Sequence, residues 1–205
     1  MFITFEGPDG SGKTTALEGL KKYLDGKDFK YVFTREPGTH CSKEANQIRK
    51  IILDKENNIT PMTEAILYAA DRRLHLEKLI WPALLKKEVV LCDRYLDSSL
   101  AYQGKARKLG IKEIKELNEI VTENTYPDVT IFFDITPAEA AKRVDSRAPK
   151  DRMELEPDSF REDVYTGYQE VIKMFPKRFR IVDASKSKEE VLEQVIKIIN
   201  KELSI

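Results

Sequence analysis

The sequence predicts an α/β domain in which a parallel β-sheet is flanked by helices. Two observations carry this prediction. Strand-like and helix-like segments alternate about five times along the 205 residues, which is the pattern of a parallel sheet with right-handed crossovers. Two short runs, EVVLCD (88–93) and VTIFFDI (129–135), are almost continuously apolar, as strands buried on both faces are. The chain length suits one domain, and we expect residues 1–205 to form it.

Strands are expected where short apolar or alternating runs are bounded by polar or glycine-rich segments. The expected strands cover residues 1–6, 29–34, 88–93, 129–135 and about 178–183. Helices are expected where apolar residues recur at three- and four-residue spacing. The expected helices cover residues 13–25, 41–54, 61–80, 111–123, 137–146, 159–174 and a last one to about 203.

The longest of these helices shows the clearest pattern. Its apolar side chains are expected to form one stripe, made of Met62, Ile66, Ala69 and Ala70. Pro82 is expected to end or kink the helix, because proline lacks a backbone N–H.

Composition narrows the class of function. Lys and Arg total 35 and Asp and Glu total 35, so the formal net charge is zero. General nucleic-acid or membrane-surface binding uses a large positive field, so neither partner is expected. Cys41 and Cys92 do not form a metal or disulfide pattern, and two reduced thiols indicate the cytoplasm. No apolar run approaches the ~20 residues of a membrane helix.

A glycine-rich loop carries the strongest signal. The segment GPDGSGKT (7–14) matches G-x-x-x-x-G-K-[ST], between a predicted strand and a predicted helix. In such a P-loop, backbone N–H groups wrap a phosphate, Lys13 reaches the outer phosphates and the Thr14 hydroxyl can hold Mg²⁺. The alternative is a glycine-rich turn without a ligand.

A second signal lies at the end of the strand 88–93. Asp93 is placed to bind Mg²⁺ directly or through water, as strand-end aspartates do beside P-loops. The alternative is an aspartate that caps the next helix. Asp134 ends a similar strand, so the pattern alone leaves both open. Arg94 favours the metal role, because it would place a phosphate-binding group next to the carboxylate.

Several arginines follow predicted strands or lie on the following helices: Arg35, Arg49, Arg72, Arg73 and Arg94. Such a set fits a second, phosphorylated substrate at the carboxyl edge of the sheet, although a single arginine is usually a solvated surface charge. Tyr68 and Arg72 are four residues apart and share a helix face, where they could stack on a base and bond its edge. Tyr68 could equally be a core residue.

The chain resembles the thymidylate kinases nearly from end to end. The pieces that carry the resemblance are FEGPDGSGKTT (5–15), TREPG (34–38), IRKIIL (48–53), EAILYAADRR (64–73), CDRYLDSSLAYQG (92–104) and DRMELEP (151–157). The resemblance implies a three-layer P-loop NTPase fold with a five-stranded parallel sheet and a short mobile lid at about 143–158. It also implies Mg²⁺-dependent transfer of the γ-phosphate of ATP to dTMP, and a homodimer.

The resemblance also implies a role for each matching residue. The implied ATP-binding residues are Gly7, Pro8, Asp9, Gly10, Ser11, Gly12, Lys13, Thr14, Thr15 and Arg143. The implied dTMP-binding residues are Asp9, Arg35, Glu36, Arg49, Tyr68, Arg72, Arg94, Ser98, Tyr102 and Gln103. Thr14 and Asp93 are the implied metal ligands. Tyr68 would stack on thymine, Arg72 would donate to its O4, and Tyr102 would disfavour ribose.

The residues that the resemblance implies in catalysis lie partly in the core of the domain and partly in the lid. The residues implied in catalysis are Lys13, Arg94, Asp9, Arg147 and Arg152. Gly10 stands where one branch of the family carries arginine, so the chain resembles the branch whose lid supplies positive charge, here from Arg147, Lys150 or Arg152. The chain departs from many bacterial relatives at Thr39, where they carry a second glycine.

Two rival functions remain at this stage. A deoxynucleoside kinase would share the architecture but would need no arginine cluster for an existing phosphate. A nucleotide-dependent switch would usually read guanine through N-K-x-D, and the Asn-Lys pair at 200–201 lacks that aspartate.

Overall fold

A parallel five-stranded sheet forms the centre of the computed structural model, which describes residues 1–145 and 151–205. The strand order is β2-β3-β1-β4-β5, and every neighbouring pair is parallel. The strands are β1 (Phe2–Glu6), β2 (Tyr31–Arg35), β3 (Val89–Asp93), β4 (Val129–Asp134) and β5 (Phe179–Asp183). The predicted sheet is therefore confirmed, and each strand begins and ends within two residues of its expected range.

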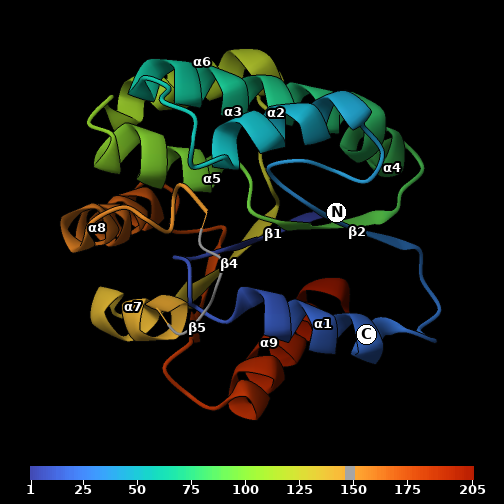
Figure 1. Cartoon of the computed structure of the whole chain (residues 1–205). Coiled ribbons are helices and arrows are strands. Elements are labelled where there is room, and N and C mark those ends of the chain that lie inside the picture. The colour runs from blue at the N-terminus through green and yellow to red at the C-terminus, as the bar shows by residue number, and fades with distance from the viewer. Residues whose placement is uncertain (146–150) are drawn as a thin grey trace.

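Helices cover both faces of the sheet, which gives the three layers visible in Figure 1. The helical segments are α1 (Lys13–Leu24), α2 (Lys43–Leu53), α3 (Pro61–His75), η1 (Leu76–Ile80), α4 (Trp81–Leu85), α5 (Leu96–Ser99), η2 (Leu100–Ala106), α6 (Ile111–Thr122), α7 (Pro137–Asp145), α8 (Asp158–Met174) and α9 (Lys188–Leu203). Helices α1, α7 and α9 pack on one face, and the helices from α3 to α6 and α8 pack on the other.

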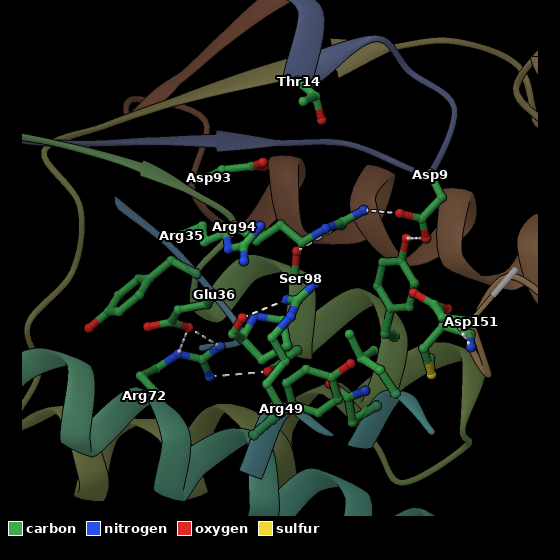
Figure 2. A pocket seen from close by; sticks show the side chains of 18 residues that line it. Asp9, Thr14, Arg35, Glu36, Arg49, Arg72, Asp93, Arg94, Ser98 and Asp151 are labelled. Carbon is green, nitrogen blue, oxygen red and sulfur yellow. Dashed lines mark hydrogen bonds and ion pairs between the residues drawn. The ribbon is translucent and has the colours of Figure 1, made fainter. Parts of the chain in front are cut away.

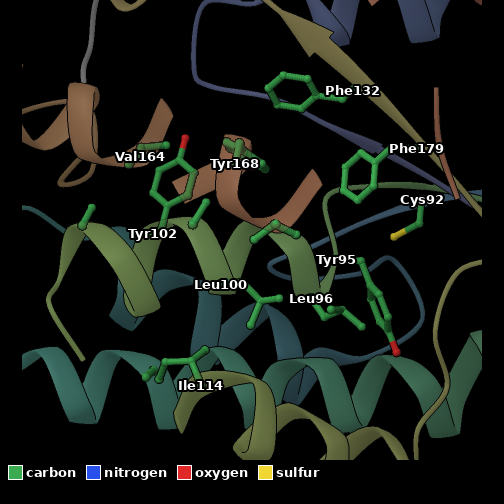
Figure 3. Close-up of a cluster of buried hydrophobic side chains, with 14 of the residues drawn as sticks. Cys92, Tyr95, Leu96, Leu100, Tyr102, Ile114, Phe132, Val164, Tyr168 and Phe179 are labelled. Atoms are coloured by element: carbon green, nitrogen blue, oxygen red, sulfur yellow. The ribbon is translucent and has the colours of Figure 1, made fainter. Parts of the chain in front are cut away.

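Each face of the sheet has its own apolar core. On the α1 face, Ile3 and Phe5 of β1 pack with Leu20 of α1. On the other face, Phe132 of β4 packs against Tyr168 of α8 with ring centroids 5.0 Å apart, and Leu96 and Leu100 belong to the same cluster (Figure 3). The strand centres are apolar on both sides for this reason.

The structure corrects the prediction in two helical regions. Residues 96–106 were assigned no helix or strand from the sequence, and they form α5 and the π-helical segment η2. The long helix does not end at Pro82. Segment η1 changes the hydrogen-bond spacing, and Pro82 then lies in the first turn of α4, where a missing N–H is tolerated.

The apolar stripe expected on α3 faces mostly outward, and of its four side chains only Ala69 is buried. Met62 is 48% exposed and Ile66 is 52% exposed, while the inner side of the helix buries Glu64, Asp71 and Arg72. These buried polar residues belong to the site described below. Because they occupy the inner side of the helix, part of its apolar side faces outward. No helix in residues 1–145 and 151–205 combines the length and apolar character that crossing a bilayer requires.

Candidate active site

The glycine-rich loop joins β1 to α1. Gly7 has a φ of 149°, and a Cβ there would lie 2.9 Å from the Phe133 carbonyl oxygen, so this position needs glycine. Gly12 has a φ of 87° and precedes the first residue of α1, which places the helix N-terminus at the loop. Lys13 donates from Nζ to the Gly7 carbonyl over 2.8 Å. Burial, aided by the neighbouring Arg94, lowers the pKa of Lys13 to about 8.

Asp93 and Thr14 line one polar hollow beside the loop. The register places Asp93 opposite Phe5 of β1, so the carboxylate ends its strand where the P-loop begins. Within the described residues, the buried Oδ1 atom of Asp93 has no hydrogen-bond partner. A buried carboxylate oxygen without a donor, close to a threonine hydroxyl, is the chemistry of a hard-cation site, so these residues fit Mg²⁺.

Arg94 connects the P-loop to the region behind it. Its backbone φ of 66° lies in the left-handed region, which is strained for a residue with a side chain. From this backbone its guanidinium donates to the Gly7 carbonyl over 3.0 Å and to Asp9 Oδ1 over 2.5 Å. Tyr102 donates to the other oxygen of Asp9 over 2.8 Å. Burial alone would raise the pKa of Asp9, but Arg94 and then Lys13 outweigh it and hold that pKa below its usual value.

A cavity of about 200 Å³ opens behind Arg94, and Figure 2 shows the side chains that line it. All ten residues that the resemblance assigned to dTMP line this cavity: Asp9, Arg35, Glu36, Arg49, Tyr68, Arg72, Arg94, Ser98, Tyr102 and Gln103. They come from the P-loop, the end of β2, helices α2 and α3, and the segment after β3. The fold therefore brings together ten residues that are spread over 95 positions of the sequence, from residue 9 to residue 103.

One end of the cavity is cationic. Arg35 is exposed at the end of β2, and Arg49 reaches it from α2. Arg49 donates to the Pro37 carbonyl over 2.6 Å, which fixes the guanidinium against the β2–α2 loop. Burial and then the charge of Arg35 lower the pKa of Arg49. Two like charges this close are stabilised by a bound anion such as a phosphate.

Arg72 also lines the cavity, and it is only 1% exposed. It donates to Glu36 from Nε over 2.8 Å and to Ser99 Oγ over 3.1 Å. Glu36 is itself fixed by His75, whose Nδ1 lies 3.0 Å from its other oxygen. The guanidinium also lies over the Tyr95 ring, 5.1 Å from its centroid. Arg72 is therefore a rigid donor group in the cavity wall.

A second cavity, of about 420 Å³, lies on the far side of the P-loop. It is lined by Gly10, Ser11, Gly12, Thr15, Ala16, Arg143, Lys186, Ser187, Lys188 and Val191. Arg143 reaches it from α7 and donates to the Ala184 carbonyl over 3.0 Å. The P-loop thus separates two cavities, as a donor site and an acceptor site require.

The predicted lid cations are only partly described. Arg147 and Lys150 lie outside the described residues. Arg152 donates to the Ile52 carbonyl over 2.8 Å and to Glu64 Oε2 over 2.7 Å, so its guanidinium rests against α2 and α3. Within the described residues, no group of three or more His, Cys, Asp or Glu side chains is arranged to hold a metal.

Hydrogen bonds fix the loop 38–40, which contains Thr39, the position where many bacterial relatives carry glycine. Gly38 has a φ of 77° and donates its N–H to Asp71 Oδ1 over 2.9 Å. Thr39 is buried with its hydroxyl 3.3 Å from that of Thr34, and His40 is exposed.

Sequence reasoning missed six residues that line the cavity: Pro37, Leu53, Tyr95, Ser99, Asp151 and Met153. Ser99 lines the cavity and bonds Arg72, but its neighbour Ser98 was chosen instead. Ser98 also lines the cavity, and its hydroxyl donates to Glu6 over 2.5 Å. Glu6 is buried behind the site, and Met153 closes the cavity wall. Only the helical structure of residues 96–106, which the sequence did not indicate, places Ser99 beside the predicted residue Gln103 on the cavity wall.

A P-loop, a strand-end Asp-Arg pair and two flanking cavities define a phosphotransferase of the nucleoside monophosphate kinase class. The sequence model of the thymidylate kinase family matches residues 5–195. The chain belongs to the thymidylate kinase family.

Individual relatives align with this chain over nearly their whole length. The thymidylate kinase of Bacillus velezensis is 49% identical over 99% of this chain and 96% of its own. That of Mycoplasma capricolum is 47% identical over the same shares. The crystal structure of thymidylate kinase from Ehrlichia chaffeensis superposes with a TM-score of 0.78 at 33% identity and covers 98% of both chains.

Proposed function

We propose that this protein is an ATP-dependent thymidylate kinase that converts dTMP and ATP to dTDP and ADP in dTTP biosynthesis. The observation that carries the proposal is the cavity behind Arg94, because arginines that can bind a phosphate and side chains that can bind a base line the same space. Family membership supports the same activity.

At the phosphate end, Arg35, Arg49 and Arg94 would bind the dTMP phosphate and direct one of its oxygens at the γ-phosphorus of ATP. That oxygen forms the new P–O bond while the bond from the γ-phosphorus to the bridging oxygen breaks, and ADP leaves with the electron pair. Arg94 contacts both Asp9 and the P-loop carbonyl, so it lies between the two substrates and would stabilise the charge on the transferring group.

At the base end, Tyr68 would stack on thymine and Arg72 would donate to O4. Cytosine carries an amino group at that position, which is itself a donor and would leave both groups unsatisfied. Ser98 and Gln103 would contact the base as well. Asp9 and Tyr102, which are hydrogen bonded to each other, would lie at the sugar, where Tyr102 would crowd a 2′-hydroxyl.

The ATP phosphates would bind the P-loop and Lys13, with the adenine in the cavity beside Arg143. Thr14 and Asp93 would hold Mg²⁺, and the orphan oxygen of Asp93 supports this assignment. When bound, the ion would neutralise phosphate charge. Arg147 and Arg152 of the segment 143–158 stay candidates for the lid cation, and that segment stays the predicted lid of a single domain.

The same proposal includes a cytoplasmic homodimer. The outward apolar side chains Met62 and Ile66 of α3, with Ile51 of α2 at 44% exposure, support a contact on this face. Both cysteines are free thiols, which supports a reducing compartment. A sedimentation measurement of the mass in solution tests the dimer.

An ADP-release assay tests the activity. ATP and Mg²⁺ are supplied with thymidylate, thymidine, deoxyuridylate or cytidylate in parallel. Fast turnover with thymidylate and little with thymidine is expected. Turnover with thymidine alone would instead support a deoxynucleoside kinase, and a guanine preference in equilibrium binding would support a nucleotide switch.

A further inference from the structure

Glu64 is a buried carboxylate for which the reaction described above has no use. It lies on the inner side of α3 with 0% exposure. Arg107 contacts it from Nε over 3.2 Å and from Nη2 over 3.1 Å, and Arg152 contacts it over 2.7 Å. Gln103 donates to it from Nε2 over 2.9 Å. Four donor contacts therefore surround one carboxylate.

The charge of Glu64 determines which way the amide of Gln103 turns. As the ion-pair partner of two guanidinium groups, Glu64 is a carboxylate, and both of its oxygens can only accept hydrogen bonds. Only the amino end of the Gln103 amide can face such a group. The carbonyl oxygen of the same amide must therefore point elsewhere.

Gln103 is 2% exposed and lines the same cavity as Tyr68, Arg72 and Ser99. With its amino end on Glu64, the amide has its carbonyl oxygen left as the acceptor for a ligand in that cavity. Thymine and uracil carry an N–H at N3, which needs an acceptor. Cytosine carries a lone pair at N3, which needs a donor.

We propose that Glu64 is a positioning residue for base selection: it locks the Gln103 amide so that an acceptor, and not a donor, meets N3 of the base. The proposal rests on the proposed function and adds a second point of discrimination to that of Arg72. Without the carboxylate, the amide can rotate by half a turn and present its amino group to cytosine.

The test compares Glu64→Gln with wild type in the ADP-release assay, using thymidylate and deoxycytidylate. Glutamine has nearly the same shape, but its own amide can donate to or accept from Gln103. We expect the ratio of kcat/KM for thymidylate over deoxycytidylate to fall about tenfold, the size of one hydrogen bond gained or lost. Arg107→Lys is the matched control. It perturbs the same cluster but leaves the Glu64 carboxylate on Gln103, so its ratio should stay at the wild-type value.

A binding measurement on the wild-type protein gives a second readout, which does not depend on the variant folding. Wild type is titrated with thymidylate and with thymidylate methylated at N3, which lacks the N–H. We expect the methylated analogue to bind at least about tenfold more weakly, and this gap should shrink in Glu64→Gln.

The outcomes separate the two proposals. Equal binding of the two ligands by wild type, or an unchanged substrate ratio in a folded Glu64→Gln, would overturn the role of Glu64. Failure of wild type to phosphorylate thymidylate at all would instead overturn the proposed function.

Discussion

Arg94 and Asp9 form an ion pair of 2.5 Å that joins the end of β3 to the P-loop. The two residues are 85 positions apart, and the parallel pairing of β1 with β3 brings them together. Because Arg94 also donates to Gly7 and Ser98, one side chain connects the nucleotide loop to the acceptor cavity.

Arg94→Ala should reduce the turnover of thymidylate by at least about 100-fold, because the transferring phosphoryl group loses its cation. Lys13 and the second cavity are unchanged, so the Kd for ATP should stay within about threefold of wild type. Steady-state rates and equilibrium titration with ATP measure the two quantities. Arg73→Ala is the control. The sequence grouped Arg73 with the arginines of the site, but it does not line the cavity and pairs instead with Glu77 and Glu123 on the surface. Normal turnover in Arg94→Ala would remove Arg94 from the site.

Asp93→Asn should raise the Mg²⁺ concentration needed for half-maximal activity by about tenfold or more, because a neutral amide is a poorer ligand for a hard cation. Titration of Mg²⁺ at fixed ATP measures the effect. Asp134→Asn is a close control, as Asp134 also ends a strand but contacts Tyr165. If both variants titrate like wild type, Asp93 has no metal role.

Tyr68→Leu should weaken thymidylate binding by about 1–3 kcal/mol, the range measured when a base loses an aromatic partner. Tyr68→Phe keeps the ring and should bind nearly as tightly as wild type. Calorimetric titration with thymidylate distinguishes the two. A loss of affinity in Tyr68→Phe equal to that in Tyr68→Leu would mean that the hydroxyl, and not the ring, binds the substrate.

Glu6 links the stability of the protein to pH. Burial, aided by Asp97, raises the pKa of this fully buried carboxyl from 4.5 to about 7. The folded state therefore holds the proton more tightly than the unfolded state does. The stability that this proton provides is present below pH 4.5 and is lost as the pH rises to about 7.

Glu6→Gln removes this titration. The free energy of unfolding of the variant, relative to wild type, should rise by roughly 3 kcal/mol between pH 4.5 and pH 8, at about 1.4 kcal/mol for each tenfold difference in proton affinity. Urea denaturation of both proteins at several pH values measures this. Glu116→Gln is the control, because Glu116 is an exposed surface residue. A pH-independent difference for Glu6→Gln would contradict the assignment.

The sequence predicts the sheet, and it predicts which residues converge on the cavity behind Arg94, for physical reasons. Strands buried on both faces leave continuous apolar runs, and the P-loop requires glycine at fixed positions such as Gly7. The carboxyl ends of parallel strands meet at one edge, so residues that follow strands, such as Arg35 and Arg94, converge there.

The helical segment 96–106 could not be predicted from local preference. It contains serines and Gly104, which favour turns. Tertiary packing determines its structure. Helix α8 crosses it so closely that a Cβ on Gly167 would lie 2.8 Å from the Ala101 Cα. The partners of Arg72 were hidden for the same reason, since Ser99 lies in this segment and Glu36 follows another strand.

The fixed state of Arg72 has a consequence for inhibitor design. Its guanidinium is already immobilised by Glu36, Ser99 and the Tyr95 ring, so a ligand that engages it loses little receptor entropy. At the cationic end, Arg35 is exposed, and a ligand there must order its long side chain. An uncharged heterocycle that fills the base end should therefore gain more affinity per atom than a phosphate mimic, and it would also enter cells more readily.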